Sequence, residues 1–172
     1  MSDRGSRVLR LLSRRRSSAA VLGPDAALLD LGLTVAETAP PVVTHVPAAR
    51  AGALVFTSGQ LPIRDGELIA RGRVGDTLGL ADGQACAQWC ALNALAAIKS
   101  EIGDLGQVKR IVKVVAYVAS GPLFTDQALV ANGASELLGK VFGDAGRHAR
   151  SAVGVSVLPL DAPVELELVV EI

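Results

Sequence analysis

The segment ARSAVGVSVLPLDAPVELELVVEI, residues 149–172, decides which kind of domain this sequence forms. It predicts an apolar strand over Ala152–Leu158 just after Arg150, a turn over Pro159–Pro163, and a return strand over Val164–Leu168. Alternation places Glu165 on the face opposite the apolar row, where a carboxylate can line a cleft. A guanidinium is the side chain best shaped to hold a small carboxylate bidentately. Taken alone, the segment favours the simpler interpretation, an edge strand with solvated charges.

The turn within this segment predicts a register. If it is centred on Leu160-Asp161, the two strands pair as a hairpin in which Glu165 lies opposite Ser156. Arg150 is then six residues further along, roughly 20 Å away at about 3.3 Å per residue. We therefore expect Arg150 and Glu165 of one chain to lie too far apart to hold one small molecule between them.

The length and composition indicate one domain of ordinary size. The chain has 172 residues, half of them apolar but only 3% aromatic, and we expect no membrane span. The first 20 residues hold six arginines and one aspartate, so the other 152 hold 11 basic and 16 acidic side chains, a net charge of −5. A net acidic body argues against nucleic acid as a partner, because binding phosphates needs a surplus of Lys and Arg.

The N-terminal residues 1–23 read as an Arg-rich leader outside the folded domain, which we expect over residues 24–172. A transit peptide or a tail that binds anionic surfaces would have such a composition. The simpler interpretation is a disordered leader, from a start codon assigned too far upstream, and its role stays open.

The rest of the chain alternates between strand and helix patterns. We expect the order β-β-β-α-β-α-β-β, an α+β fold with an antiparallel-rich mixed sheet and two main helices on one face. The expected elements are a short helix over Pro24–Leu33, strands over Val42–Val46, Ala53–Thr57 and Gly66–Gly72, a helix over Leu80–Ile102, a strand over Val108–Ala119, a helix over Thr125–Phe142, and the two strands described above.

The strand Val108–Ala119 is apolar on both faces beyond Lys113, so both faces should be buried there. Two helices cover only one face of a sheet. The other face then needs a second subunit, which indicates a closed homo-oligomer.

The cysteines Cys86 and Cys90 are four residues apart in a helical pattern with no His or further Cys nearby. This spacing is a poor metal site and no disulfide framework, so we expect no metal and no cofactor. Small buried side chains in a protein of the reducing cytoplasm are the favoured interpretation.

The turn Ser58-Gly59-Gln60-Leu61-Pro62 offers a hydroxyl and a glycine at which the backbone can approach a ligand closely. Alone it is a plain turn. Together with the strand Val108–Ser120 and the run from Ala149 through Pro159 to Glu165, however, it resembles the RidA/YjgF family of imine and enamine deaminases, also described as endoribonuclease L-PSP-like. The resemblance covers roughly Pro41–Ile172 and implies a chorismate-mutase-like fold, a homotrimer and ligand clefts between subunits.

The resemblance also implies site residues. Arg150 matches the family's carboxylate-binding Arg, Glu165 the Glu that helps to place the attacking water, and Ser58 the family's Ser, with Gly59 beside it. At three further positions the chain departs from the better-known members or matches them only loosely. His45 stands where those members have Tyr, and Ala152 where they often have Cys. Their active-site Asn lies on the second helix, but the spacing from this helix to the Arg differs here, so Asn132 is only a loose match.

These departures resemble a divergent subfamily marked by GRHARSAVGV, residues 146–155. His148 is two residues from Arg150 and should point to the same side of the strand; both a ligand contact and a surface loop position stay open. The effect of His45 and Ala152 on activity is also open.

The activity that the resemblance implies is hydrolysis of reactive 2-imino or enamine acids to 2-keto acids and ammonia, which controls metabolite damage. An imine carbon is already electrophilic, so an Arg clamp and a polarised water are enough. The alternative is a non-catalytic trimer that binds small carboxylates or regulates a partner protein. A ribonuclease, also attached to this family, is disfavoured by the acidic body. Because Arg150 and Glu165 should lie far apart in one chain, a site that uses both must take them from neighbouring subunits.

Overall fold

The computed structural model describes residues 23–35 and 45–172. The leader up to residue 22 lies outside the described residues, as does most of the predicted strand Val42–Val46, whose described residues His45 and Val46 are not in a strand. The elements in chain order are α1 (Pro24–Asp30), β1 (Ala48–Ala51), β2 (Leu54–Thr57), β3 (Ile63–Arg64), β4 (Glu67–Leu68), α2 (Leu80–Ile102), η1 (Leu105–Gln107), β5 (Arg110–Ala119), α3 (Gln127–Val130), α4 (Asn132–Phe142), η2 (Gly143–Gly146), β6 (Ala149–Val155), η3 (Pro159–Asp161) and β7 (Val164–Glu171).

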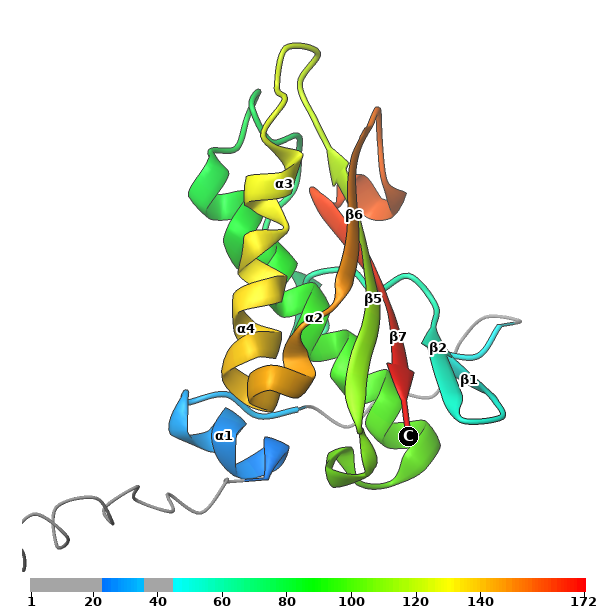
Figure 1. Cartoon of the computed structure of the whole chain (residues 1–172). Helices are drawn as coiled ribbons and strands as arrows, with labels where there is room; N and C mark the ends of the chain where they lie inside the picture. Colours follow the sequence, from blue (N-terminus) through cyan, green and yellow to red (C-terminus); the bar gives the residue numbers. More distant parts are fainter. Residues whose placement is uncertain (1–22, 36–44) are drawn as a thin grey trace, which may run out of the picture.

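The main sheet has five strands in the order β1-β2-β7-β5-β6, with β5 and β6 parallel and the other pairs antiparallel. The strands β3 and β4 form a separate small hairpin. Both main helices, α2 and α4, lie on the same side of the main sheet (Figure 1). The predicted α+β class, an antiparallel-rich mixed sheet with two main helices on one face, is confirmed.

The predicted pairing of the last two strands is wrong. The local turn forms as expected, because Leu160 and Asp161 have positive φ and the Ala162 N–H donates to the Pro159 carbonyl at 3.1 Å. The strands on either side of it nevertheless separate, and β6 and β7 flank β5 on opposite edges. β5 lies inside the sheet, and its backbone N–H and C=O groups are paired on both edges, with β6 on one edge and β7 on the other.

The faces of β5 alternate between the helix layer and an open side. Val114 is fully buried beneath the helices, whereas Val115 and Tyr117 are half-buried on the open side. The register with β7 shifts between Ile111 and Lys113, which lets Ile111 be buried as well. No described element covers the open side.

Small residues bring the two long helices close together. A Cβ atom on Gly133 of α4 would lie 2.0 Å from the backbone oxygen of Gln84 in α2. Alanines such as Ala87 and Ala91 are fully buried in α2. α2 and α4 therefore pack closely against each other. This contact fixes the position of the first turn of α4, which carries part of the candidate site.

Candidate active site

The first cluster of polar side chains surrounds Arg150, the second residue of β6. Arg150 is paired with Val114, so its side chain points to the helix side of the sheet. One terminal nitrogen, Nη1, donates both to Asn132 Oδ1 at 2.9 Å and to Ser135 Oγ at 3.0 Å. Asn132 and Ser135 lie three residues apart at the start of α4 and therefore share one face of the helix. Both acceptors are neutral, so they orient the guanidinium without neutralising its charge.

The other edge of this guanidinium is free. Within residues 23–35 and 45–172, no hydrogen bond reaches Nε or Nη2 of Arg150, and no ion pair includes it. A guanidinium binds a carboxylate through two parallel N–H donors. Arg150 is thus a half-buried cation whose Nε/Nη2 edge is available to bind a carboxylate bidentately.

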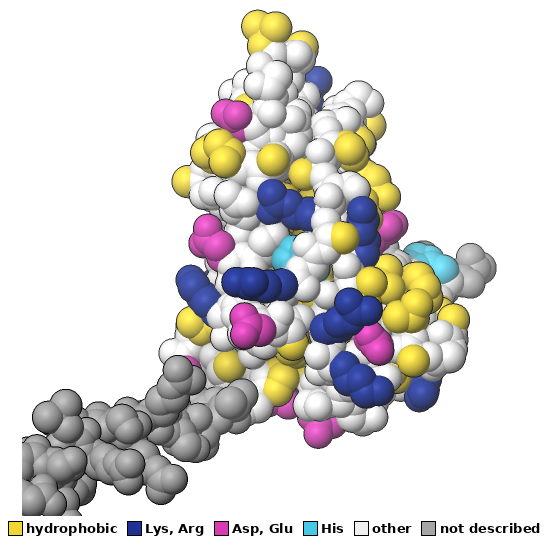
Figure 2. All heavy atoms as spheres, in the orientation of Figure 1, with side chains coloured by type: hydrophobic (Ala, Val, Ile, Leu, Met, Phe, Trp, Pro, Cys, Tyr) yellow, Lys and Arg dark blue, Asp and Glu magenta, His cyan; other side chains and the backbone are white. Residues whose placement is uncertain are grey.

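His148 extends this cluster. Its Nε2 lies 2.9 Å from Ser135 Oγ and its Nδ1 lies 2.6 Å from the Gly146 carbonyl oxygen. An open hollow of about 450 Å³ lies beside these groups and is lined by Ser135, Gly139, Gly146, Arg147, His148 and Arg150. Figure 2 shows this side of the molecule, where Lys and Arg side chains spread over α4 and the neighbouring strands. The hollow is therefore suited to an anion.

The second cluster surrounds Glu165 of β7. Glu165 is paired with Tyr117 and points to the open side of the sheet. Its carboxylate occupies the space that a side chain at Gly59 would need, because a Cβ there would lie 1.7 Å from Glu165 Oε1. Burial of the carboxyl, followed by the negative charge of Glu167, raises the pKa of Glu165. A carboxylate in this setting is a better proton acceptor than an ordinary one.

Ser58 lies next to Gly59 and is held by the chain that leads into β1. Its hydroxyl donates to the Val46 carbonyl at 2.6 Å and its backbone N–H to the Pro47 carbonyl at 2.9 Å. His45, which directly precedes Val46, is exposed. Ser58, Gly59 and Glu165 therefore form one polar corner, with His45 at its margin.

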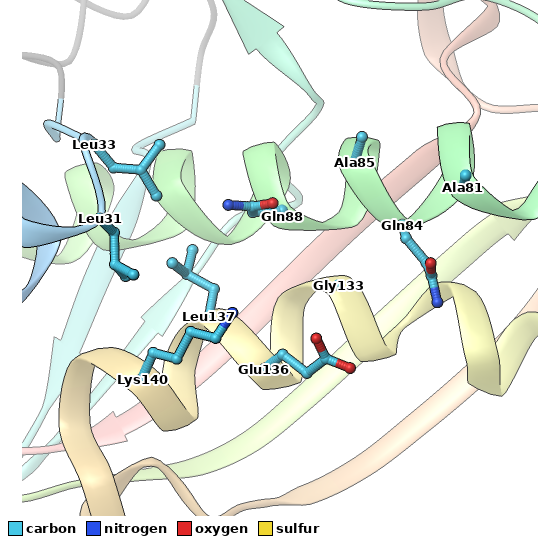
Figure 3. A pocket seen from close by; sticks show the side chains of 10 residues that line it. All are labelled: Leu31, Leu33, Ala81, Gln84, Ala85, Gln88, Gly133, Glu136, Leu137 and Lys140. Atoms are coloured by element: carbon cyan, nitrogen blue, oxygen red, sulfur yellow. The ribbon is translucent and has the colours of Figure 1, made fainter.

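A separate hollow lies elsewhere. A groove of about 470 Å³ runs between α2 and α4 on the outer side of the helix layer and is lined by Leu31, Leu33, Ala81, Gln84, Ala85, Gln88, Gly133, Glu136, Leu137 and Lys140 (Figure 3). Glu136 and Lys140 are its only charged side chains, and none of the residues predicted for the site lines it.

The cysteines behave as small apolar side chains. Cys86 and Cys90 are buried and unpaired. Burial, with the charge of Asp82, raises the pKa of Cys86 to about 11, and burial raises the pKa of Cys90 well above its ordinary value. Neither thiol therefore becomes a nucleophile near neutral pH. In the part of the chain that the structure describes, no three His, Cys, Asp or Glu residues are grouped to hold a metal ion, and no helix is long and apolar enough to cross a membrane.

Comparison with known proteins gives the family. The profile described as "YjgF/chorismate_mutase-like, putative endoribonuclease" matches residues 25–172. The chain belongs to the RidA/YjgF family. It is 43% identical to Protein TCP17 of Trypanosoma cruzi over 148 residues, which cover 86% of this chain and 92% of that protein.

Two solved structures place the fold within the family. The Agrobacterium tumefaciens protein Atu1372, of unknown function, is 42% identical, with a TM-score of 0.81 over 87% of this chain and 92% of that one. The Escherichia coli YjgF gene product is 25% identical, with a TM-score of 0.58 over 80% of this chain and 93% of that one. The chorismate-mutase-like fold expected from the sequence is thereby confirmed.

The RidA/YjgF site residues predicted from the sequence fall into the two clusters. Arg150 and Asn132 are in direct contact, so Asn132 reaches Arg150 despite the unusual spacing. Ala152 is half-buried on the same face of β6. Ser58, Gly59 and Glu165 gather on the other side. Ser135 was not predicted from the sequence, where its only signal is its spacing of three residues from Asn132 on a helix.

Within one chain the two clusters are separated by the sheet itself. Val114 and Tyr117, the partners of Arg150 and Glu165, lie on opposite faces of β5. The predicted hairpin register does not hold, but the corrected topology also keeps Arg150 and Glu165 of one chain apart. Each cluster is half of a possible site.

Proposed function

We propose that this RidA/YjgF protein hydrolyses reactive 2-imino acids, and enamines that tautomerise to them, to 2-keto acids and ammonia. The observation that carries the proposal is the guanidinium of Arg150. Asn132 and Ser135 take both hydrogens of Nη1, and the Nε/Nη2 edge is left for a ligand. This edge fits the carboxylate that imino and keto acids share.

The reaction needs one water and one residue that carries a proton. Water attacks the imine carbon while the carboxylate is held by Arg150, and Glu165 accepts the proton that the water gives up. Glu165 returns this proton to the imine nitrogen, which gives a carbinolamine. Glu165 then takes the hydroxyl proton and passes it to the amino nitrogen, so that the carbon–oxygen double bond forms as the carbon–nitrogen bond breaks and ammonia leaves. The raised pKa of Glu165, caused by burial and by the negative charge of Glu167, makes it a better proton acceptor than an ordinary carboxylate and favours its role in these transfers.

The proposal includes a homotrimer. Phe56 and Val153 lie on the uncovered side of the sheet and are 42% and 44% exposed, beside half-buried Val115. Burying such a face needs a second copy of the chain. The proposal further places the Arg150 cluster of one subunit, carried by the edge strand β6, against the Glu165 cluster of the next, which makes the site composite.

Ammonia release tests the activity. An amino-acid oxidase generates the 2-imino acid in situ, and ammonia formation is followed with and without the protein. We expect the wild-type protein to accelerate release and Arg150→Ala to release ammonia at the rate without protein. Equal rates with wild-type protein and Arg150→Ala would refute the proposal.

A binding protein is the competing function, because His45 and Ala152 depart from the better-known family members. A calorimetric titration with pyruvate separates the two. Pyruvate binding that depends on Arg150, without faster ammonia release, would identify a non-catalytic trimer that binds small carboxylates or acts on a partner protein.

A further inference from the structure

For a neutral imidazole, the hydrogen bonds around His148 have only one consistent direction. The Gly146 carbonyl can only accept, so the Nδ1 atom 2.6 Å away must carry the hydrogen. In a neutral imidazole Nε2 is then an acceptor, and it takes the hydroxyl hydrogen of Ser135 at 2.9 Å. The Ser135 oxygen in turn presents a lone pair to Nη1 of Arg150 at 3.0 Å.

This chain of bonds matters because a serine hydroxyl alone has no fixed direction. It rotates freely and can present either its hydrogen or a lone pair to a neighbour. A guanidinium only donates, and with its hydrogen committed to His148 the Ser135 hydroxyl holds a lone pair toward Nη1 of Arg150. Together with Asn132, this second acceptor fixes the plane of the guanidinium, because both hydrogens of Nη1 are now engaged.

We propose that His148 is a positioning residue that acts through Ser135 to turn the Nε/Nη2 edge of Arg150 toward the substrate carboxylate. The inference rests on the proposed function, in which that edge holds the carboxylate. His148 itself need not touch the ligand. His148 lies with Arg150 in the stretch GRHARSAVGV, residues 146–155. In this proposal, one role of that stretch is to orient the Arg150 guanidinium.

Two isosteric substitutions separate the two bonds of His148. In His148→Gln the amide oxygen can take the place of Nε2 and accept from Ser135. In His148→Asn the shorter amide reaches the place of Nδ1 and can donate to Gly146, but it loses the bond to Ser135. Pyruvate affinity is measured by calorimetry for both variants, for His148→Ala and for Ser135→Ala, after thermal melting shows that each is folded.

We expect His148→Ala and His148→Asn to weaken pyruvate binding about tenfold, the scale of one lost hydrogen bond. His148→Gln should stay within about threefold of the wild-type affinity. The double variant His148→Ala/Ser135→Ala should bind no more weakly than the weaker single variant, because both changes break the same chain. In turnover assays the loss should appear in KM rather than in kcat. Equal affinities of the Gln and Asn variants, or wild-type affinity in His148→Ala, would overturn the proposal.

A readout without ligand tests the same chain. The protein has two histidines, so ¹⁵N NMR of the imidazoles can be assigned with a His45→Gln variant. At about pH 8, where an ordinary imidazole is neutral, we expect His148 to carry its hydrogen on Nδ1. Hydrogen on Nε2 would overturn the proposal.

The same measurements distinguish a failure of the proposed deaminase activity from a failure of the role of His148. Protein that binds pyruvate through Arg150 but releases no ammonia refutes the deaminase and leaves the role of His148 standing. Protein that binds no pyruvate refutes both.

Discussion

Replacing Gly59 with Ala should disable the site without unfolding the protein. The added Cβ would lie 1.7 Å from Glu165 Oε1 and 2.7 Å from its carboxyl carbon, whereas ordinary van der Waals contact begins near 3.4 Å. The carboxylate oxygen must therefore move by roughly 1.7 Å, the difference between the two distances. A misplacement of about 1 Å in an active site can lower the rate by about 100-fold, so we expect kcat for ammonia release to fall at least that far.

The same geometry predicts what the substitution leaves unchanged. The atoms that the methyl group meets belong to a side chain that can swing away on the open face, and Gly59 does not have a positive φ that only glycine tolerates. The melting temperature should therefore change little. KM should also stay near the wild-type value, because the carboxylate of the substrate is held by Arg150, in the other cluster.

A matched glycine serves as control. A Cβ on Gly23 meets no atom within 4 Å, so Gly23→Ala should keep wild-type kcat and melting temperature. Ammonia release and thermal unfolding are measured for both variants. Activity of Gly59→Ala within a few-fold of wild type, in folded protein, would refute the role given to Glu165.

The remaining predictions concern three other side chains. Arg150→Lys should lose most of the activity at an almost unchanged melting temperature, because Lys cannot form the bidentate pair; wild-type turnover would rule out the assignment. Burial raises the pKa of Glu165, so the folded protein holds this proton more tightly than the unfolded chain does. The free energy of unfolding therefore falls as the pH rises from the pKa of the unfolded chain, about 4.5, through the higher pKa of the folded protein. Glu165→Gln should therefore raise the melting temperature at neutral pH, and a gain that persists below about pH 4 would contradict this reasoning. Val114→Asp should unfold the protein, since a buried unpaired carboxylate costs several kcal/mol; a circular dichroism melt like that of wild type would contradict it.

The sequence predicted the elements well where local signals agree. The helix over Leu80–Ile102 was predicted with its observed bounds, because glycines flank both ends of a long run rich in Ala and Leu. The central strand was recognised from its two apolar faces. Its observed start, at Arg110, is two residues later than predicted.

The pairing of β6 and β7 was not predictable from local sequence. The turn at Leu160-Asp161 has the backbone of a tight turn, and a turn of this kind ordinarily joins paired strands. Which edges pair is decided by β5, which needs two partners, and this is a property of the whole sheet. The contact between Asn132 and Arg150 depends in the same way on how α4 lies against β6, so spacing along the chain left it open.

The composite site is tested most directly by mixing subunits. Arg150→Ala and Glu165→Ala proteins, each inactive alone, are unfolded together, refolded together and assayed for ammonia release, with mixed oligomers verified by mass spectrometry. Some interfaces of a mixed trimer pair an intact Arg150 cluster with an intact Glu165 cluster, so we expect partial recovery of activity. Mixed trimers without any activity, under conditions in which refolded wild-type protein is active, would contradict it.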